Sequence, residues 1–332
     1  MIAPLTPLSI SGVLWFQGEE NAAENRNQCG SCSYGGGPRY ACLMQAMIES
    51  WREAWVTKDF PFAMVQLAAY YSSGADINAI RIAQAMATDL TTQTGMALAI
   101  DHGDPTAPLG PVHSRDKEPV ARRLAATMFR LRGCPSDCAA GGGSCKLPSC
   151  GAHAEGAILP SGEVLRANGP RLTSSVLSSF AGNVSIVQLH FNHSTGLRFA
   201  NTSLCNISQP VGSGKRRRHC CAALPDTMRL CLGGTGAANA PFDLNTSSCF
   251  GLDEITADAT TGTVHMRATT PGPAGWVQWS ADPYPECALL NDAGLPASPF
   301  AAKLESATGN AEPLKTESGD GAAAELTVRR GV

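Results

Sequence analysis

The chain lacks any run of about 18 apolar residues, the length that a membrane-spanning helix requires, and it lacks an excess of basic charge. Its 25 Lys and Arg residues and 28 Asp and Glu residues leave a formal net charge of -3. Neither nucleic acid nor a membrane is therefore an expected partner, because no electrostatic attraction for either covers the chain. A hydrophobic content of 43% excludes disorder throughout. The 332 residues suffice for two domains of roughly 100–200 residues each.

A recognisable secretion signal is also missing, because residues 1–16 contain neither a basic segment nor a small-residue cleavage site. Thirteen cysteines nevertheless indicate an oxidising compartment, and five Asn-x-Ser/Thr sequons indicate one that glycosylates. The sequons lie at Asn183, Asn192, Asn201, Asn206 and Asn245. We therefore expect a secreted or lysosomal protein whose signal lies upstream of Met1.

Residues 1–133 alternate between the hydrophobic periods of strands and helices. Buried strands are predicted at three short apolar runs, Ser9–Phe16, Phe62–Leu67 and Met96–Asp101. Helices are predicted at Arg39–Trp55, at Asn78–Leu90 and from near Asp116, with Ser114 or Asp116 as the N-cap. The first helix would bury one stripe, made of Leu43, Met47, Trp51 and Trp55. This order predicts an α/β fold with a parallel sheet sandwiched by helices.

Four cysteines and three consecutive glycines between Cys134 and Cys150 indicate a disulfide-closed surface loop between two domains. Beyond it, short strands alternate with turn residues, as at Ser185–Phe191, Val264–Ala268 and Trp276–Ser280. We expect an α/β domain at 1–133, a linker at 134–156 and a β-rich domain of the sandwich type at 157–301. A disordered tail is expected at 302–332, because Ala, Gly, Glu and Thr dominate there without periodicity.

Polar residues follow two predicted strands at the carboxyl edge of the sheet, where open α/β sheets bind ligands. Gln17–Asn21 combines a glycine N–H, an amide and two carboxylates, which suit an oxyanion and a base that needs an orienting acid. The second stretch is Asp101–His113, and an imidazole at its end can act as a general base near neutral pH. On residue types alone, a helix-capping loop and a solvated histidine are the stronger interpretations. The position of both polar stretches at one shared edge of the sheet nevertheless favours a functional site.

A series of segments carries a family resemblance, in the same order along the chain. They are Met1–Leu5, Gly12–Asn21, Trp51–Glu53, Pro61–Leu67, Ile80–Gln84, Val112–Lys117 and Arg123–Leu124. These segments resemble the sialate O-acetylesterases, a family of the SGNH-hydrolase superfamily. The resemblance continues more weakly in His219–Cys221 and from Trp276 to Phe300. It implies a partial SGNH-type parallel sheet and a serine esterase that works without a metal or other cofactor.

The resemblance also implies roles for single residues. Gly18 and Asn21 would form the oxyanion hole, and His113 would be the catalytic base. Gln17 and Arg81 would help to bind substrate or shape the site.

The acid that orients His113 has three candidates. Many SGNH enzymes place an Asp three residues before the catalytic His, but Gly110 stands at that position here. Related acetylxylan esterases use the Glu of their Gln-Gly-Glu motif, and Glu19 matches that position. We therefore favour Glu19 as the acid, with Asp104 and then Asp101 as alternatives.

The family's nucleophile motif, similar to Gly-Gln-Ser-Asn-Met, does not occur in this sequence. Met1 matches an internal Met of the family, so we expect this chain to be the C-terminal part of a longer enzyme. Without the serine, a covalent acyl intermediate cannot form, and only a small residual rate from oxyanion stabilisation could survive. We also expect an exposed apolar edge where the first strand of the sheet is missing.

The expected function is that of a carboxylic-ester hydrolase that removes O-acetyl groups from sialic acids or related acylated sugars. Two alternatives remain: an acetylxylan-type carbohydrate esterase, and a non-catalytic, disulfide-stapled glycan-binding module. The Cys29–Cys32 pair fits a structural disulfide better than zinc, because no second CxxC lies at zinc-knuckle spacing.

Overall fold

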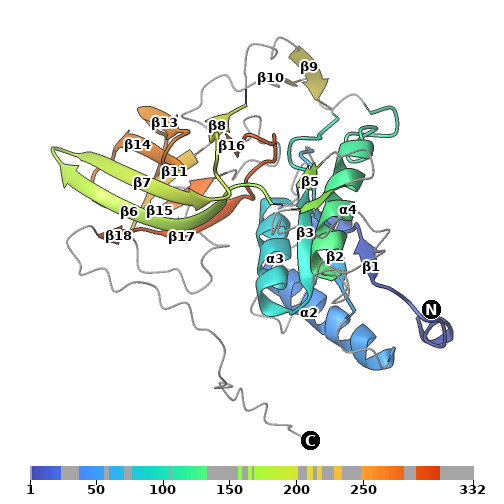
Figure 1. Cartoon of the computed structure of the whole chain (residues 1–332). Helices are drawn as coiled ribbons and strands as arrows, with labels where there is room; N and C mark the ends of the chain where they lie inside the picture. Colours follow the sequence, from blue (N-terminus) through green and yellow to red (C-terminus); the bar gives the residue numbers. More distant parts are fainter. Residues whose placement is uncertain are drawn as a thin grey trace, which may run out of the picture.

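A computed structural model of the chain shows two domains, one with a parallel sheet and one built from antiparallel sheets (Figure 1). The structure describes residues 2–23, 37–55, 60–70, 77–104, 107–132, 156–158, 164–166, 168–200, 208–211, 215–218, 228–233, 248–279 and 289–306. No helix among these residues is long and apolar enough to cross a membrane.

The N-terminal domain contains a three-stranded parallel sheet in the order β1-β2-β3. Its strands are β1 (Val13–Trp15), β2 (Phe62–Gln66) and β3 (Thr94–Leu98), and Phe62 of β2 pairs with Val13 on one side and Thr94 on the other. Four helices and a short 3-10 turn accompany the sheet. They are η1 (Ala3–Leu5), α1 (Glu19–Ala23), α2 (Gly37–Ala54), α3 (Ile77–Leu90) and α4 (Glu118–Arg132).

Helices cover both faces of this sheet, as predicted (Figure 1). Alternate residues of β2 point to opposite faces, so Phe62 and Met64 pack with α2 and α3 in one apolar core. Val65 packs with Val120 of α4 on the other face. β2 is apolar except for Gln66, and it is buried along its whole length because it is the central strand.

Three details of the predicted elements were wrong. The first strand is not a buried strand: β1 lies at the sheet edge, and Leu14 and Phe16 remain 59% and 41% exposed. Leu43, assigned to the buried stripe of α2, is exposed, whereas Met47, Trp51 and Trp55 of that stripe pack partly buried against the core. The fully buried residues of this helix are Tyr40, Ala41, Met44 and Ile48.

The third error concerns the start of α4. The helix begins at Glu118, and neither predicted N-cap residue fulfils that role. Within the described chain, the buried Ser114 hydroxyl has no hydrogen-bond partner, and the Asp116 carboxylate instead contacts the His102 imidazole.

The second domain is a β-sandwich, as expected. A five-stranded sheet has the order β13-β14-β7-β6-β18, and a four-stranded sheet has the order β12-β11-β15-β17. The strands are β6 (Arg171–Ala181), β7 (Val184–Asn192), β11 (Met228–Leu232), β12 (Cys249–Phe250), β13 (Glu254–Asp258), β14 (Thr263–Thr269), β15 (Ala274–Trp279), β17 (Phe300–Lys303) and β18 (Glu305–Ser306). Inward-facing residues such as Val187, Leu189, Val264 and Trp279 form the core between the sheets.

Three antiparallel pairs complete the described structure. These are β4 (Gly156–Ile158) with β5 (Val164–Arg166), β8 (Arg198–Phe199) with β16 (Leu289–Leu290), and β9 (Ser208–Val211) with β10 (Lys215–Arg218). The predicted start of a disordered tail at 302 was wrong, because residues 300–306 belong to β17 and β18.

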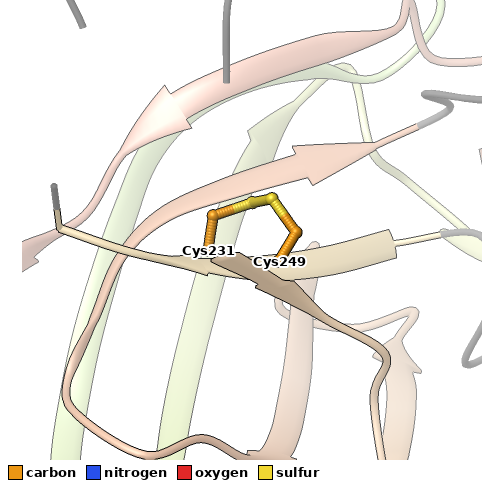
Figure 2. Close-up of a disulfide and its surroundings, with 2 residues drawn as sticks. All are labelled: Cys231 and Cys249. Atoms are coloured by element: carbon orange, nitrogen blue, oxygen red, sulfur yellow. A yellow bond between two sulfur atoms is a disulfide. The ribbon is translucent and has the colours of Figure 1, made fainter. Parts of the chain in front are cut away.

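A disulfide joins Cys231 of β11 to Cys249 of β12 across the edge of the four-stranded sheet (Figure 2). Cys42 on α2 is a free, exposed cysteine. The Cys29–Cys32 pair and the four cysteines from Cys134 to Cys150 lie outside the described residues, so their expected disulfides stay a prediction.

Candidate active site

The loop that follows β1 carries the first group of predicted site residues. Gly18 has φ +141°, a conformation that L-residues rarely adopt. A Cβ at this position would lie 3.1 Å from Ile80 Cγ2 and 3.2 Å from Tyr40 Oη, so the site also has little room for a side chain. Within the described chain, the Gly18 N–H donates to no acceptor, although its carbonyl accepts from the Ala22 N–H at 3.1 Å. This N–H is available to an oxyanion.

Two buried side chains from α2 and α3 hold the loop in place. The Tyr40 hydroxyl donates to the Gln17 carbonyl at 3.0 Å, and Gln84 Nε2 donates to the same carbonyl at 3.1 Å. Gln84 Oε1 accepts from the Leu67 N–H at 3.0 Å, which ties the loop to the end of β2. Burial raises the pKa of Tyr40 to about 12, so the phenol remains a hydrogen-bond donor throughout the ordinary pH range.

Asn21 and Glu19 lie on α1, directly after Gly18. The Asn21 amide oxygen accepts from Gln17 Nε2 at 2.6 Å, and this contact orients the side chain. The Glu19 carbonyl accepts from the Tyr70 hydroxyl at 3.3 Å. Burial, and then the nearby charge of Glu19, raises the pKa of Tyr70 to about 12. The Glu19 carboxylate therefore lies close enough to Tyr70 to act on it electrostatically.

His113 lies in the loop between β3 and α4, and two polar side-chain contacts close that loop. Arg115 donates to Asp104 through Nε at 2.6 Å, through Nη2 at 3.0 Å and through its backbone N–H at 3.2 Å. Asp104 also raises the pKa of the Arg115 guanidinium, chiefly through this side-chain hydrogen bond. His102 Nδ1 lies 2.8 Å from Asp116 Oδ2 and makes the second closure.

The loop base is anchored to α4 by a third pair. Arg123 donates to both carboxylate oxygens of Asp101, at 2.6 and 2.8 Å, and to the Leu98 carbonyl at 2.8 Å. These contacts fix the point at which the chain leaves the carboxyl end of β3.

The two predicted site loops lie side by side. Lys117 Nζ, at the end of the His113 loop, lies 4.9 Å from the centre of the Phe16 ring, which precedes the Gly18 loop. Val112, next to His113, packs against the same apolar core as Trp15. The structure thus places the expected base and the expected oxyanion donors at one edge of the sheet.

The structure does not form the expected catalytic dyad. The exposed His113 imidazole makes no hydrogen bond or ion pair with any described residue. This includes the three candidate acids, Glu19, Asp104 and Asp101. Asp104 and Asp101 are instead engaged by Arg115 and Arg123. The identity of the orienting acid stays a prediction.

Arg81 does not reach the surface where a ligand would bind. The residue is 0% exposed, and its guanidinium donates to the carbonyls of Leu67 and Ala68 at the end of β2, at 3.0 and 2.6 Å. Arg81 supports the chain that follows β2, which fits the expected role of shaping the site, and a role in binding substrate stays a prediction.

Tyr40, Tyr70, Gln84 and Arg115 shape this edge and were missed as site residues. For Gln84 the signal was present, because Asn78, Arg81 and Gln84 recur every third residue in an otherwise apolar helix. Buried polar groups in such a helix must find hydrogen-bond partners. No group of three or more metal-ligating side chains occurs in the described part of the chain.

Comparison with known proteins identifies relatives of part of this chain and a solved structure that shares the fold of most of it. Residues 3–108 match the family described as carbohydrate esterase, sialic acid-specific acetylesterase. Sialate O-acetylesterase of Rattus norvegicus is 35% identical over 139 residues, which covers 37% of this chain and 24% of that protein. The Homo sapiens enzyme is 33% identical over the same length, with the same shares covered.

The match spans about a quarter of the length of these curated relatives, at 24%. A crystal structure of a carbohydrate acetylesterase from Xanthomonas citri superimposes with a TM-score of 0.55 at 22% identity. It covers 90% of this chain and 51% of that one, and at this identity it establishes the shared fold only.

Proposed function

We propose that the N-terminal domain, which over residues 3–108 matches the sialic acid-specific carbohydrate acetylesterases, provides the acid–base and oxyanion half of an ester-hydrolase site. The observation that carries this proposal is the free Gly18 N–H beside the His113 loop. An oxyanion hole needs such a preorganised donor, and acyl transfer needs an imidazole within reach of it.

In the proposed reaction, a serine hydroxyl attacks the acetyl carbonyl while His113 accepts the hydroxyl proton. The negative charge that develops on the carbonyl oxygen is stabilised by the Gly18 N–H and the Asn21 amide. The intermediate collapses, the sugar oxygen leaves with the proton from His113, and an acetyl-serine remains. Water then attacks with the help of His113, which releases acetate and restores the serine.

The serine nucleophile in this proposal lies outside the chain. The supporting observation is the missing Gly-Gln-Ser-Asn-like motif, together with the exposed side chains of Leu14 on the edge strand β1 and of Phe16 directly after it. Edge strands with exposed apolar side chains are avoided in natural proteins unless another segment covers them. A further strand that pairs with β1 would both cover these side chains and bring a nucleophile to the carboxyl edge.

Glu19 is proposed as the orienting acid, because Arg115 and Arg123 already occupy the other two carboxylates. The proposed substrate is an O-acetylated sialic acid or a related acetylated sugar, and the proposed location is a secretory or lysosomal compartment. The Cys231–Cys249 disulfide supports an oxidising compartment.

The first experiment reads the transcript upstream of the codon for Met1. An upstream frame that encodes a signal peptide and a Gly-Gln-Ser-Asn-like motif supports the esterase. The protein from that frame should then release acetate from 9-O-acetyl-N-acetylneuraminate, and His113→Ala should lower kcat by about 10³-fold or more. His190→Ala, in the sandwich domain, is the matched control.

A second experiment tests the 332-residue chain directly with a fluorophosphonate, which labels activated serines. We expect no labelling that depends on His113. A serine of this chain that is labelled in the native protein but not in His113→Ala would refute the external nucleophile. A transcript that begins at Met1, with glycan binding but no ester hydrolysis, would instead establish the glycan-binding module.

A further inference from the structure

A pocket of about 500 Å³ lies between the two domains, away from the proposed active site. One wall is the outer edge of β3 with the C-terminal turns of α3 and α4, and the other wall comes from residues 168–172 and 298–302 of the sandwich domain. The two domains meet here through the Gln66 Nε2 bond to Ser298 Oγ at 2.8 Å. A pocket of this size can hold a mono- or disaccharide.

The pocket contains one cation without a counter-charge. Within the described residues, the side chain of Arg130 on α4 makes no ion pair or hydrogen bond, while the carboxylate of Asp89 is already paired with Arg171 at 2.8 Å. Arg130 as a whole is exposed, but partial desolvation lowers the pKa of its guanidinium. An incoming anion would provide the missing partner.

Gly95 makes room for this guanidinium. A Cβ on Gly95 would lie 3.0 Å from Arg130 Nη2 and 2.7 Å from Thr127 Cγ2. Because Gly95 has no side chain, Arg130 can lie directly against the backbone of β3. The arrangement brings a charged donor next to the edge of a strand inside the pocket.

The edge of β3 adds backbone groups that can bind hydroxyls. β3 is the last strand of its sheet in the described structure, so alternate N–H and C=O groups face outward without a ladder partner. Across the pocket lie the amides of Asn168 and Asn192 and the imidazole of His193. Apolar groups of Met96 and Phe300 complete the lining. Such a mixture suits the hydroxyl and C–H groups of a sugar.

The charge balance favours a carboxylate over a phosphate. A single unpaired guanidinium matches one negative charge, and the bidentate geometry of arginine suits a carboxylate. A dianionic phosphate would face Asp89 and the carbonyl end of α3 on the same wall, both of which disfavour negative charge.

We propose that this inter-domain pocket binds a carboxylate-bearing sugar, with the carboxylate on Arg130 and the hydroxyls on the β3 edge and the Asn168–Asn192 wall. The site is separate from the proposed catalytic edge. Arg130 lies twelve residues beyond the first residue of α4, or about 18 Å along the helix axis from the end nearest His113. The proposal therefore does not depend on the esterase assignment.

Isothermal titration of the 332-residue protein with D-glucuronate and with D-glucose tests the proposal, because the two sugars differ only in the carboxylate. The protein should come from a host without N-glycosylation, since Asn192 lies in a sequon. We expect glucuronate to bind about tenfold or more tightly than glucose, the factor that one charge-assisted hydrogen-bonded pair provides. Equal binding of the two sugars, or no binding of glucuronate, would overturn the proposal.

Four variants assign the binding to this pocket. Arg130→Gln should weaken glucuronate binding about tenfold, whereas Arg132→Gln, on the same helix but outside the pocket, should leave it unchanged. Asp89→Asn should strengthen it, because a negative charge is removed from the wall. Ala85→Trp should block the pocket while Arg130 stays in place, which keeps the test valid if Arg130→Gln does not fold. Tighter binding of inorganic phosphate than of glucuronate, abolished by Ala85→Trp, would identify a phosphate site and refute the carboxylate.

Discussion

The ammonium nitrogen of Lys117 lies 4.9 Å from the centre of the Phe16 ring, and this contact joins the two loops of the proposed active site. Phe16 leads into the Gly18 loop, and Lys117 ends the loop that carries His113. The two residues are far apart in the sequence, so only the packing of β1 beside β2 and of α4 on β2 and β3 brings them together.

The Lys117–Phe16 contact should contribute a measurable coupling energy. A double-mutant cycle of Lys117→Met and Phe16→Leu, followed by urea unfolding, should give about 0.5 kcal/mol, the usual value of an exposed cation–π pair. Lys303→Met on β17 is the control for removing a surface ammonium. A coupling energy of zero in this double-mutant cycle would mean that the contact does not hold the loops together.

Gly18→Ala should destabilise the protein by about 1–3 kcal/mol, because the substitution combines an unfavourable φ with contacts near 3.1 Å to Ile80 and Tyr40. Gly110→Ala separates the two causes. Gly110 also has positive φ, at +104°, but no atom lies within 4 Å of its Cβ position. Thermal unfolding of both variants should show the larger loss for Gly18→Ala, and equal losses would rule out the tight packing around the loop.

Asp104→Ala should loosen the loop that carries His113. The substitution removes the acceptor of the Arg115 side chain and of the Arg115 backbone N–H. Amide hydrogen exchange over residues 101–117 should become faster, most clearly at Arg115. Asp253→Ala, an exposed carboxylate in the other domain, serves as the control. Unchanged protection at Arg115 would show that the ion pair does not order the loop.

Alkaline pH should reveal the buried phenol of Tyr40. Its pKa is raised from 10.0 to about 12 in the folded protein, so the folded state holds a proton that the unfolded state loses first. The contribution of this group to stability is complete below pH 10 and is lost as the pH rises towards 12. Tyr40→Phe should remove one late step from the ultraviolet phenol titration and flatten the fall in stability over this interval. An unchanged titration curve would contradict the assignment.

Removal of the disulfide should lower stability more than removal of the free thiol. Cys231 and Cys249 close a loop with a sequence separation of 18, for which chain-entropy arguments give about 3 kcal/mol. The double variant Cys231→Ala/Cys249→Ala should therefore unfold at clearly lower urea concentration, whereas Cys42→Ser at the exposed position should not. Equal unfolding midpoints would show that the disulfide adds no stability.

Periodicity in the sequence predicted the parallel sheet, the helices α2, α3 and α4, and the sandwich, because buried apolar positions repeat at the period of the element that buries them. It was wrong about the burial of β1 and of Leu43 on α2. Ser9–Phe16 looks like a central strand, but the strand beyond β1 that would bury Leu14 is not among the described residues. On α2, Met47, Trp51 and Trp55 pack against the core as predicted, but Leu43 is exposed.

The sequence by itself determined that Gln17–Asn21 and His113 follow strands, and hence that they share the carboxyl edge of a parallel sheet. Only the tertiary structure decided which polar groups remain available there. Arg115 and Arg123 bind Asp104 and Asp101, Arg81 donates to buried backbone carbonyls, and the Gly18 N–H meets no acceptor among the described residues. Ion pairs and hydrogen bonds act over a few ångströms between residues distant in the chain, so no local pattern of residues specifies them.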